Sequence, residues 1–228
     1  KFDVVITEIG GTVGDIESLP YIEAVRQLKY EMGEHNTLFI HLTLVPYLKA
    51  SGELKTKPTQ HSVKVLLENG IQPNILVLRT EKDLSLDIRK KVAQFCNVDL
   101  DSVIQSIDVS TIYEVPILMQ QEKLDVIVLK KLNLPYDGEA DLSSWKDFLN
   151  KLKNPKKSVE IALVGKYVEL QDSYKSINES LIHAGAVNEC KVNIHYIHSE
   201  QLNESNYINK LKKLGFKRHL FTYCLLYK

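Results

Sequence analysis

Acidic residues and glycines stand together near the start of the chain, directly after an apolar run. Residues 2–7 predict a buried parallel strand, Glu8 follows its end, three glycines come next, and Asp15 and Glu17 precede a helix. Ligands of open α/β sheets bind outside the carboxyl ends of the strands, where a carboxylate can bind the magnesium ion of a nucleotide. The glycines allow the backbone to approach such a ligand closely. A tight turn with a solvated Glu8 is the alternative.

A second polar segment, residues 51–61, leads into a helix that we expect to begin near Pro58. It contains Lys55 and Lys57 together with two threonines and a glutamine. The N-terminus of a helix carries free N–H groups and partial positive charge, and the lysines add point charges, so the segment predicts a phosphate-bearing ligand. A solvated capping loop is the alternative, because the chain contains no GxxxxGK[ST] phosphate loop.

Composition limits the class of protein. The 29 Lys and Arg residues balance the 29 Asp and Glu residues, so no global field would attract nucleic acid or an anionic membrane. Cys96, Cys190 and Cys224 are widely spaced and form no CxxC pair, which favours reduced thiols in the cytoplasm over disulfides or a zinc site. The longest apolar runs are far shorter than a membrane span.

Other candidate catalytic or metal-binding residues are better explained as structural. His195 and His198 differ by three positions on an expected strand, so they point to opposite faces and make a poor metal pair. Cys96 ends an expected helix among apolar neighbours, with no identifiable base nearby to activate it. We expect His41 and His61 to be structural as well.

Hydrophobic spacing predicts alternating strands and helices over the first 132 residues, which indicates an α/β fold with a parallel sheet covered by helices. The strands are expected at 2–7, 37–45, 75–78 and 103–107, and the helices at 18–32, 58–69, 86–95, 111–121 and 124–132.

The character of the sequence changes at residues 133–157, where prolines and lysines accumulate, and this segment predicts an interdomain linker. A second α/β unit follows over 158–214. Its expected elements are strands at 159–165 and 191–197 and helices at 173–184 and 203–214.

Several motifs together resemble the CTP synthase family, the glutamine-dependent amidoligases that make CTP from UTP. The resemblance runs from Phe2 to about Leu214 and implies a P-loop-type amidoligase domain followed by the start of a class I glutamine amidotransferase domain. The motifs that carry it are EIGGTVGDIESLP, HLTLVPYLKASGELKTKPTQHSV, GIQPNILVLR, FCNV and VGKYVELQDSYKSI.

The resemblance implies a reaction and its partners. The family phosphorylates the 4-oxygen of UTP with ATP and Mg²⁺, and ammonia from glutamine then displaces the phosphate. CTP acts as a feedback inhibitor. Family members are homotetramers whose pyrimidine nucleotide site lies between subunits.

The resemblance also implies roles for individual residues of this chain. Glu8 matches the magnesium ligand, and Lys91 matches a further pyrimidine nucleotide contact. The remaining matches are Asp15, Ile16 and Glu17 for CTP, Lys55, Thr56, Lys57, Pro58, Thr59 and Gln60 for the UTP or CTP phosphates, and Ile107, Asp108 and Val109 for the adenine of ATP.

Parts of the family pattern have no match. The family's phosphate loop would precede Lys1, and its glutaminase cysteine, histidine and glutamate would follow Leu214. Cys224 lacks the glycine-rich setting of that nucleophile. Residues 215–228 depart from the family pattern, which predicts an out-of-frame tail or an early stop.

We therefore expect a CTP synthase fragment that does not complete the reaction by itself. A catalytically silent module that binds UTP or CTP or supports assembly is one alternative. An amidoligase of the biotin pathway is the other.

Overall fold

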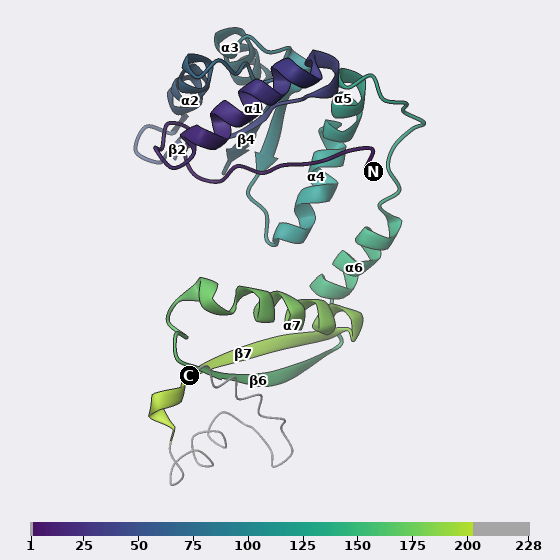
Figure 1. Cartoon of the computed structure of the whole chain (residues 1–228). Helices are drawn as coiled ribbons and strands as arrows, with labels where there is room; N and C mark the ends of the chain where they lie inside the picture. The colour runs from purple at the N-terminus through teal and green to yellow at the C-terminus, as the bar shows by residue number, and fades with distance from the viewer. Residues whose placement is uncertain (1, 203–228) are drawn as a thin grey trace. The chain divides into compact units, whose positions relative to one another are not determined.

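The computed structural model describes residues 2–202 and divides the chain into two compact units, Lys1–Asp141 and Leu142–Lys228 (Figure 1). The division falls inside the segment 133–157, where the sequence predicts a linker. The expected helix at 203–214 and the tail at 215–228 lie outside the described residues. Over the described part of the chain, no helix is both long and apolar enough to cross a bilayer.

The first unit is built on a three-stranded parallel sheet. Its strands are β1 (Ile40–Val45), β4 (Ile75–Thr80) and β5 (Val103–Ile107), in the order β1-β4-β5. All three consist largely of Leu, Ile, Val and Thr, which suit a sheet covered by helices. The predicted α/β fold with a parallel sheet is confirmed for this unit.

Helices cover both faces of this sheet (Figure 1). On one face, α2 (Lys57–Glu68) and α3 (Leu86–Cys96) contribute Val63, Val92, Ala93 and Cys96 to a core with Val45, Leu76, Leu78 and Val103. On the other face, α4 (Val115–Gln121) and α5 (Leu124–Lys131) cover Ile75, Val77 and Ile104. A separate apolar cluster joins α1 (Leu19–Met32) to α2.

Polar side chains dock α2 onto β1. The Nε2 atom of His41 lies 2.9 Å from Ser62 Oγ, and the hydroxyls of Thr43 and Thr59 lie 3.0 Å apart. Thr59 also donates to the carbonyl oxygen of Leu44, at 3.3 Å. Because buried polar groups need partners, these contacts fix how α2 lies along β1 and therefore where α2 begins.

A short hairpin connects β1 to α2. Its strands, β2 (Tyr47–Leu48) and β3 (Glu53–Leu54), are antiparallel, and the turn between them contains Gly52 with φ of +68°. The carbonyl oxygen of Leu48 accepts from Ser51 N and Gly52 N, at 3.1 and 2.9 Å. The sequence predicts a polar loop here, because two-residue strands are too short to show alternation.

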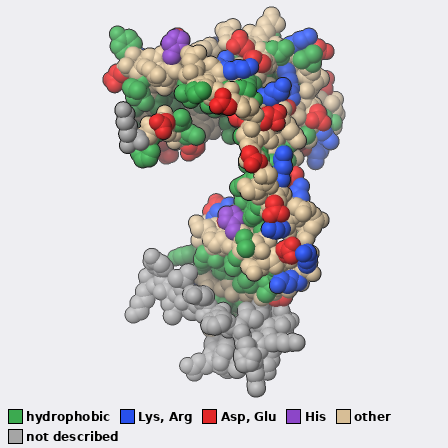
Figure 2. Space-filling model, turned by 90° about the vertical axis from the view of Figure 1, so that its right-hand side faces the viewer, with side chains coloured by type: hydrophobic (Ala, Val, Ile, Leu, Met, Phe, Trp, Pro, Cys, Tyr) green, Lys and Arg blue, Asp and Glu red, His purple; other side chains and the backbone are tan. Residues whose placement is uncertain are grey.

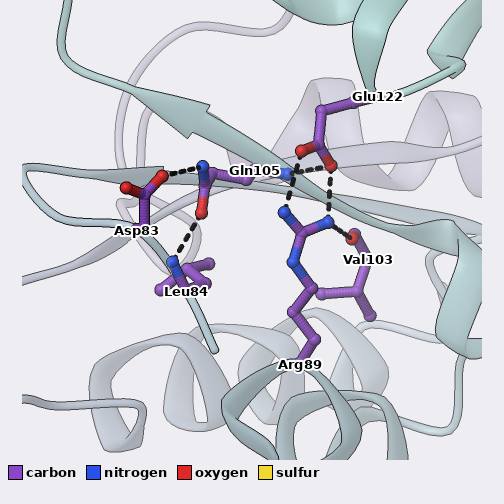
Figure 3. A network of polar contacts seen from close by, with 6 residues as sticks. All are labelled: Asp83, Leu84, Arg89, Val103, Gln105 and Glu122. Carbon is purple, nitrogen blue, oxygen red and sulfur yellow. Dashed lines mark hydrogen bonds and ion pairs between the residues drawn. The ribbon is translucent and has the colours of Figure 1, made fainter. Parts of the chain in front are cut away.

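An ion pair ties α3 to the sheet and to the junction of α4 and α5 (Figure 3). The guanidinium of Arg89 donates two parallel hydrogen bonds to the carboxylate of Glu122, at 2.5 and 2.8 Å, and a longer one to the carbonyl oxygen of Val103. The same carboxylate accepts from Gln105 N, at 3.1 Å. Burial alone would raise the pKa of Glu122, but the hydrogen bonds from Arg89 and Gln105 outweigh it and lower that pKa.

Gln105 extends this network to the loop before α3 (Figure 3). Its side-chain oxygen accepts from Leu84 N, at 2.5 Å, and its amide nitrogen donates to Asp83, at 3.0 Å. Both ends of the loop-to-helix segment are thus bonded to β5, so the register of α3 against the sheet is fixed.

The predicted opening strand over residues 2–7 is wrong. The segment forms no strand and is exposed, with 85% of Phe2 and 92% of Ile6 accessible. An apolar run shows a tendency to be buried, but a parallel strand also needs a hydrogen-bonded neighbour and covering helices, and the described residues supply neither here.

Other element bounds shift by a few residues. The strand expected from residue 37 begins at Ile40, and the helix expected over 111–121 is a 3-10 turn, Ile112–Glu114, followed by α4. Pro116 lies in the first turn of α4, where a proline fits because its missing N–H has no helical partner.

The second unit contains one parallel β-α-β arrangement. Strands β6 (Lys157–Gly165) and β7 (Cys190–His198) pair in parallel, and α7 (Lys175–Val187) connects them. Helix α6 (Ser143–Lys153) packs on α7, where the ring of Phe148 meets the ring of His183 edge-on at 5.8 Å. The sequence predicted both strands and the helix between them.

The buried His41 predicts a pH dependence of stability. Burial lowers the pKa of His41 from its usual 6.5, so the folded state holds it neutral while the unfolded state takes up a proton. Stability is therefore fully present above pH 6.5 and falls as the pH drops from there toward the folded-state pKa. We expect His41→Asn to remove up to about 1.4 kcal/mol per pH unit of this slope. Native-state hydrogen exchange of β1 and α2 amides would measure the slope of stability against pH in the wild type and in His41→Asn. Equal slopes in the two proteins would contradict the role of His41.

The ion pair between Arg89 and Glu122 predicts a second stability effect. Glu122→Gln leaves a half-buried guanidinium without its counter-charge, so we expect a loss of about 1–3 kcal/mol in the opening free energy of β5 amides. Glu68→Gln is the matched control, because Glu68 forms an exposed pair with Lys64 on α2. Equal effects of the two substitutions in native-state hydrogen exchange would refute the structural role of the network.

Candidate functional site

An open pocket of about 880 Å³ lies where the chain leaves the carboxyl end of β1. The hairpin, the first residues of α2 and one side of α3 form its walls. The lining residues are Tyr47, Leu48, Gly52, Glu53, Leu54, Lys55, Thr56, Lys57, Ile88 and Lys91. This is the position at which parallel α/β sheets bind ligands.

The beginning of α2 gives the pocket its anion-binding character. Thr56 is the residue before the helix, and its side chain does not cap the helix but accepts from Gln60 Nε2, at 3.1 Å. The first-turn N–H groups therefore have no side-chain cap, and Pro58 in that turn has no N–H to satisfy. Free N–H groups together with the helix dipole favour a phosphate here.

Lysines surround this helix start, and one of them is already paired. Lys55 Nζ lies 2.5 Å from Glu53 Oε2, whereas Lys57 and Lys91 make no ion pair with any residue that the structure describes. Just outside the lining, Lys82 Nζ lies 5.7 Å from the centre of the Tyr47 ring. On the visible face of the described residues, acidic and basic side chains are intermixed (Figure 2).

The structure brings together four of the residues that the resemblance connected with UTP or CTP. Lys55, Thr56 and Lys57 come from the hairpin and the start of α2, and Lys91 comes from α3. The network between Arg89, Glu122 and Gln105 fixes the helix that carries Lys91. Distant segments of the sequence thus share one pocket.

The other residues of that motif have different surroundings. Pro58 is exposed in the first turn of α2, and Gln60 is bonded to Thr56. Thr59 is fully buried, and its hydroxyl is used by Thr43 and the backbone of β1. Its side chain therefore contributes to the docking of α2 and does not line the pocket.

The acidic segment near the start of the chain lies elsewhere. Glu8, Asp15, Ile16 and Glu17 are all exposed, and none of them lines the pocket. A Cβ atom on Gly14 would lie 3.3 Å from Val65, which is two turns and about 12 Å further along α2 than the pocket. Within one chain, the segment and the pocket therefore touch different turns of the same helix.

The segment that the resemblance connected with adenine follows β5. Asp108 N donates to the carbonyl oxygen of Thr80, at 2.9 Å, and the Asp108 carboxylate pairs with Arg79 at the same distance. Ile107 and Val109, on either side, are half-buried. All three residues lie at the carboxyl edge of the sheet, as the pocket does, two strand spacings or roughly 10 Å from β1.

Among the described residues, Glu8 offers magnesium a single carboxylate ligand and not a complete metal-binding site. Residues 2–202 contain no group of three or more His, Cys, Asp or Glu side chains that could hold a metal. Glu8 is exposed and makes no hydrogen bond or ion pair with another described residue. One free carboxylate fits magnesium, which often binds to one or two carboxylates together with substrate phosphates and water.

Cys96 and His41 have the buried surroundings that suit the structural roles the sequence predicts for them. Burial raises the pKa of the Cys96 thiol to about 11, so it stays protonated and unreactive at neutral pH. His41 is neutral and bonded to Ser62.

Sequence reasoning did not predict six of the lining residues, which are Tyr47, Leu48, Gly52, Glu53, Leu54 and Ile88. Ile88 stands three positions before Lys91 on α3, so helical spacing could have found it. Tyr47 and Glu53 line the same pocket because the hairpin pairs Tyr47 with Leu54 and Leu48 with Glu53.

Comparison with known proteins agrees with the resemblance in the sequence. The family described as CTP synthase N-terminus matches residues 1–134. The CTP synthase of Christiangramia forsetii is 66% identical over 213 residues, which cover 93% of this chain and 39% of the relative. The CTP synthase of Cytophaga hutchinsonii is 68% identical over 206 residues, covering 90% of this chain and 38% of that relative.

A more distant relative gives the same result. The CTP synthase of Porphyromonas gingivalis is 58% identical over 214 residues, covering 94% of this chain and 40% of the relative. The chain thus spans about two fifths of the length of the curated relatives that it matches. On the family match over more than half of its residues, the chain belongs to the CTP synthase family.

Proposed function

We propose that the pocket at the start of α2 binds the phosphates of UTP and CTP. The observation that carries this proposal is the meeting of Lys55, Thr56 and Lys57 with Lys91 in one open pocket at the carboxyl edge of the sheet. A triphosphate needs several cationic and N–H donors at once, and this is the place in the described chain where they converge.

The pocket also offers groups for the rest of a nucleotide. Tyr47 and Leu48 provide an apolar wall, and Ile88 faces the same space from α3. Ligand sites of this kind combine apolar walls with a few convergent polar groups. The wall residues would hold the base or ribose while the lysines hold the phosphates.

We further propose that this site serves the ATP-dependent amination of UTP to CTP. In this scheme, ATP lies against Ile107, Asp108 and Val109 at the same sheet edge. Glu8 would hold the Mg²⁺, which would neutralise charge on the transferred phosphoryl group. The ammonia would come from glutamine through a class I amidotransferase domain, of which residues 158–214 form the beginning. The cytoplasm suits such a reaction, because thiols such as Cys96 stay reduced there.

The separation between the pocket and the acidic segment supports a site shared between copies of the chain. Gly14, which directly precedes Asp15, Ile16 and Glu17, lies beside Val65, about two turns of α2 from the pocket lysines, so these three residues would contact CTP in the pocket of a second copy. Helix α1, next to them, exposes Tyr21 and Tyr30, by 65% and 90%. Such exposed aromatic side chains suit an interface, in keeping with a homotetramer.

On its own, this 228-residue chain would bind pyrimidine nucleotide without completing the reaction. It contains no GxxxxGK[ST] sequence to position ATP, and positioning supplies most of the catalysis in phosphoryl transfer. Residues 2–7 are exposed and form no strand, so Glu8 is not held at the end of a strand. This observation favours a silent binding module as a second candidate.

Substitution of the unpaired lysines tests the pocket. We expect Lys57→Ala and Lys91→Ala each to weaken UTP binding by roughly 10- to 100-fold, because each removes a charge-assisted contact to phosphate. Isothermal titration of the whole chain would measure this. Lys64→Ala on α2 and Lys90→Ala on α3 are matched controls, since both lysines lie outside the pocket. Equal losses in all four variants would contradict a phosphate site there.

A turnover assay separates binding from catalysis. With UTP, ATP, Mg²⁺ and ammonia supplied directly, we expect this chain to form no CTP while it still binds UTP in titration. Chromatographic separation of UTP and CTP would detect the product. CTP formation would show that the chain positions ATP without a phosphate loop, and would rule out the silent module.

A further inference from the structure

One carboxylate lies inside the pocket that we assign to a polyanion. Glu53 is a lining residue, and its carboxylate is bonded to Lys55, another lining residue, at 2.5 Å. Both side chains remain accessible, Glu53 by 60% and Lys55 by 42%, so a ligand in the pocket can contact either of them.

The carboxylate of Glu53 does not hold the hairpin together. Glu53 pairs with Leu48 in the hairpin through its backbone, and the turn is held by the carbonyl oxygen of Leu48. Its one side-chain partner among the described residues is Lys55. An exposed ion pair of this kind contributes little to stability, so the hairpin would fold equally well with a neutral side chain at this position.

The ion pair between Glu53 and Lys55 reduces the positive charge that the pocket presents to a ligand. While Glu53 is bonded to Lys55, the positive charge available for phosphate comes from Lys57, Lys91 and the start of α2. A phosphate that contacts Lys55 must displace Glu53 or share the ammonium group with it, and in both cases it approaches the negative charge of Glu53. The hydrogen bond from Lys55 lowers the pKa of Glu53, so the carboxylate stays ionised at neutral pH.

We infer that Glu53 competes with the nucleotide phosphates for Lys55 and thereby holds the affinity of the pocket for UTP and CTP below its attainable value. This inference rests on the proposed function and adds a regulatory role within the same site. A weaker site responds to changes in nucleotide concentration over a higher range, which suits a pocket that must release its ligand.

The test is a substitution that is expected to improve binding, which a damaged fold cannot imitate. We expect Glu53→Gln to tighten UTP binding to the whole chain by roughly three- to tenfold at low salt, as measured by isothermal titration. Glu68→Gln removes the same charge from an ion pair on α2 outside the pocket, and it should leave the affinity within about twofold.

Two further measurements identify the cause. Uridine, which carries no phosphate, should gain nothing from Glu53→Gln, and the gain for UTP should shrink as the salt concentration rises, because screening weakens the repulsion. A gain for uridine equal to that for UTP would show a change of pocket shape and overturn the inference.

The outcomes also separate the inference from the function on which it rests. If wild-type chain binds UTP and Glu53→Gln binds it equally or more weakly, the inference is wrong and the proposed pocket stands. Weaker binding that appears only with Mg²⁺ would indicate that Glu53 holds the metal of the nucleotide instead. If neither chain binds UTP, the proposed function itself fails.

Discussion

The contact between β1 and α2 is the constraint on which the pocket depends. Thr43 and Thr59 share a buried hydrogen bond, and His41 meets Ser62 one turn further along. A slip of α2 by one residue would separate all these partners and leave buried polar groups unsatisfied. Because the contact allows one register, it fixes the start of α2 beside the carboxyl end of β1.

The other walls of the pocket follow from that placement. The hairpin must bridge the short gap from Val45 to Thr56, so Tyr47 and Glu53 are folded back over the helix start. Helix α3 reaches the same space from the next strand connection, and the bonds between Arg89 and Glu122 hold it there. A parallel sheet thus gathers two connections at one edge, although they are far apart in the sequence.

The sequence predicted the elements whose signal is local. Helical spacing and Gly33 placed α1, and Pro58 placed the start of α2 within one residue of its position. Three features depended on distant partners and were missed. Residues 2–7 look like a strand but have no neighbour in the described chain, the two-residue strands of the hairpin are too short to show a pattern, and Thr59 is buried by Thr43, which lies on another element.

Binding of a pyrimidine nucleoside triphosphate in the pocket is tested most directly by titrating the isotope-labelled chain with UTP and following its backbone amides by NMR. We expect the largest changes in chemical shift at residues 47–57 and 88–91, with the amides of β6 and β7 unchanged. Shifts confined to other residues, or no shifts at millimolar UTP, would contradict it.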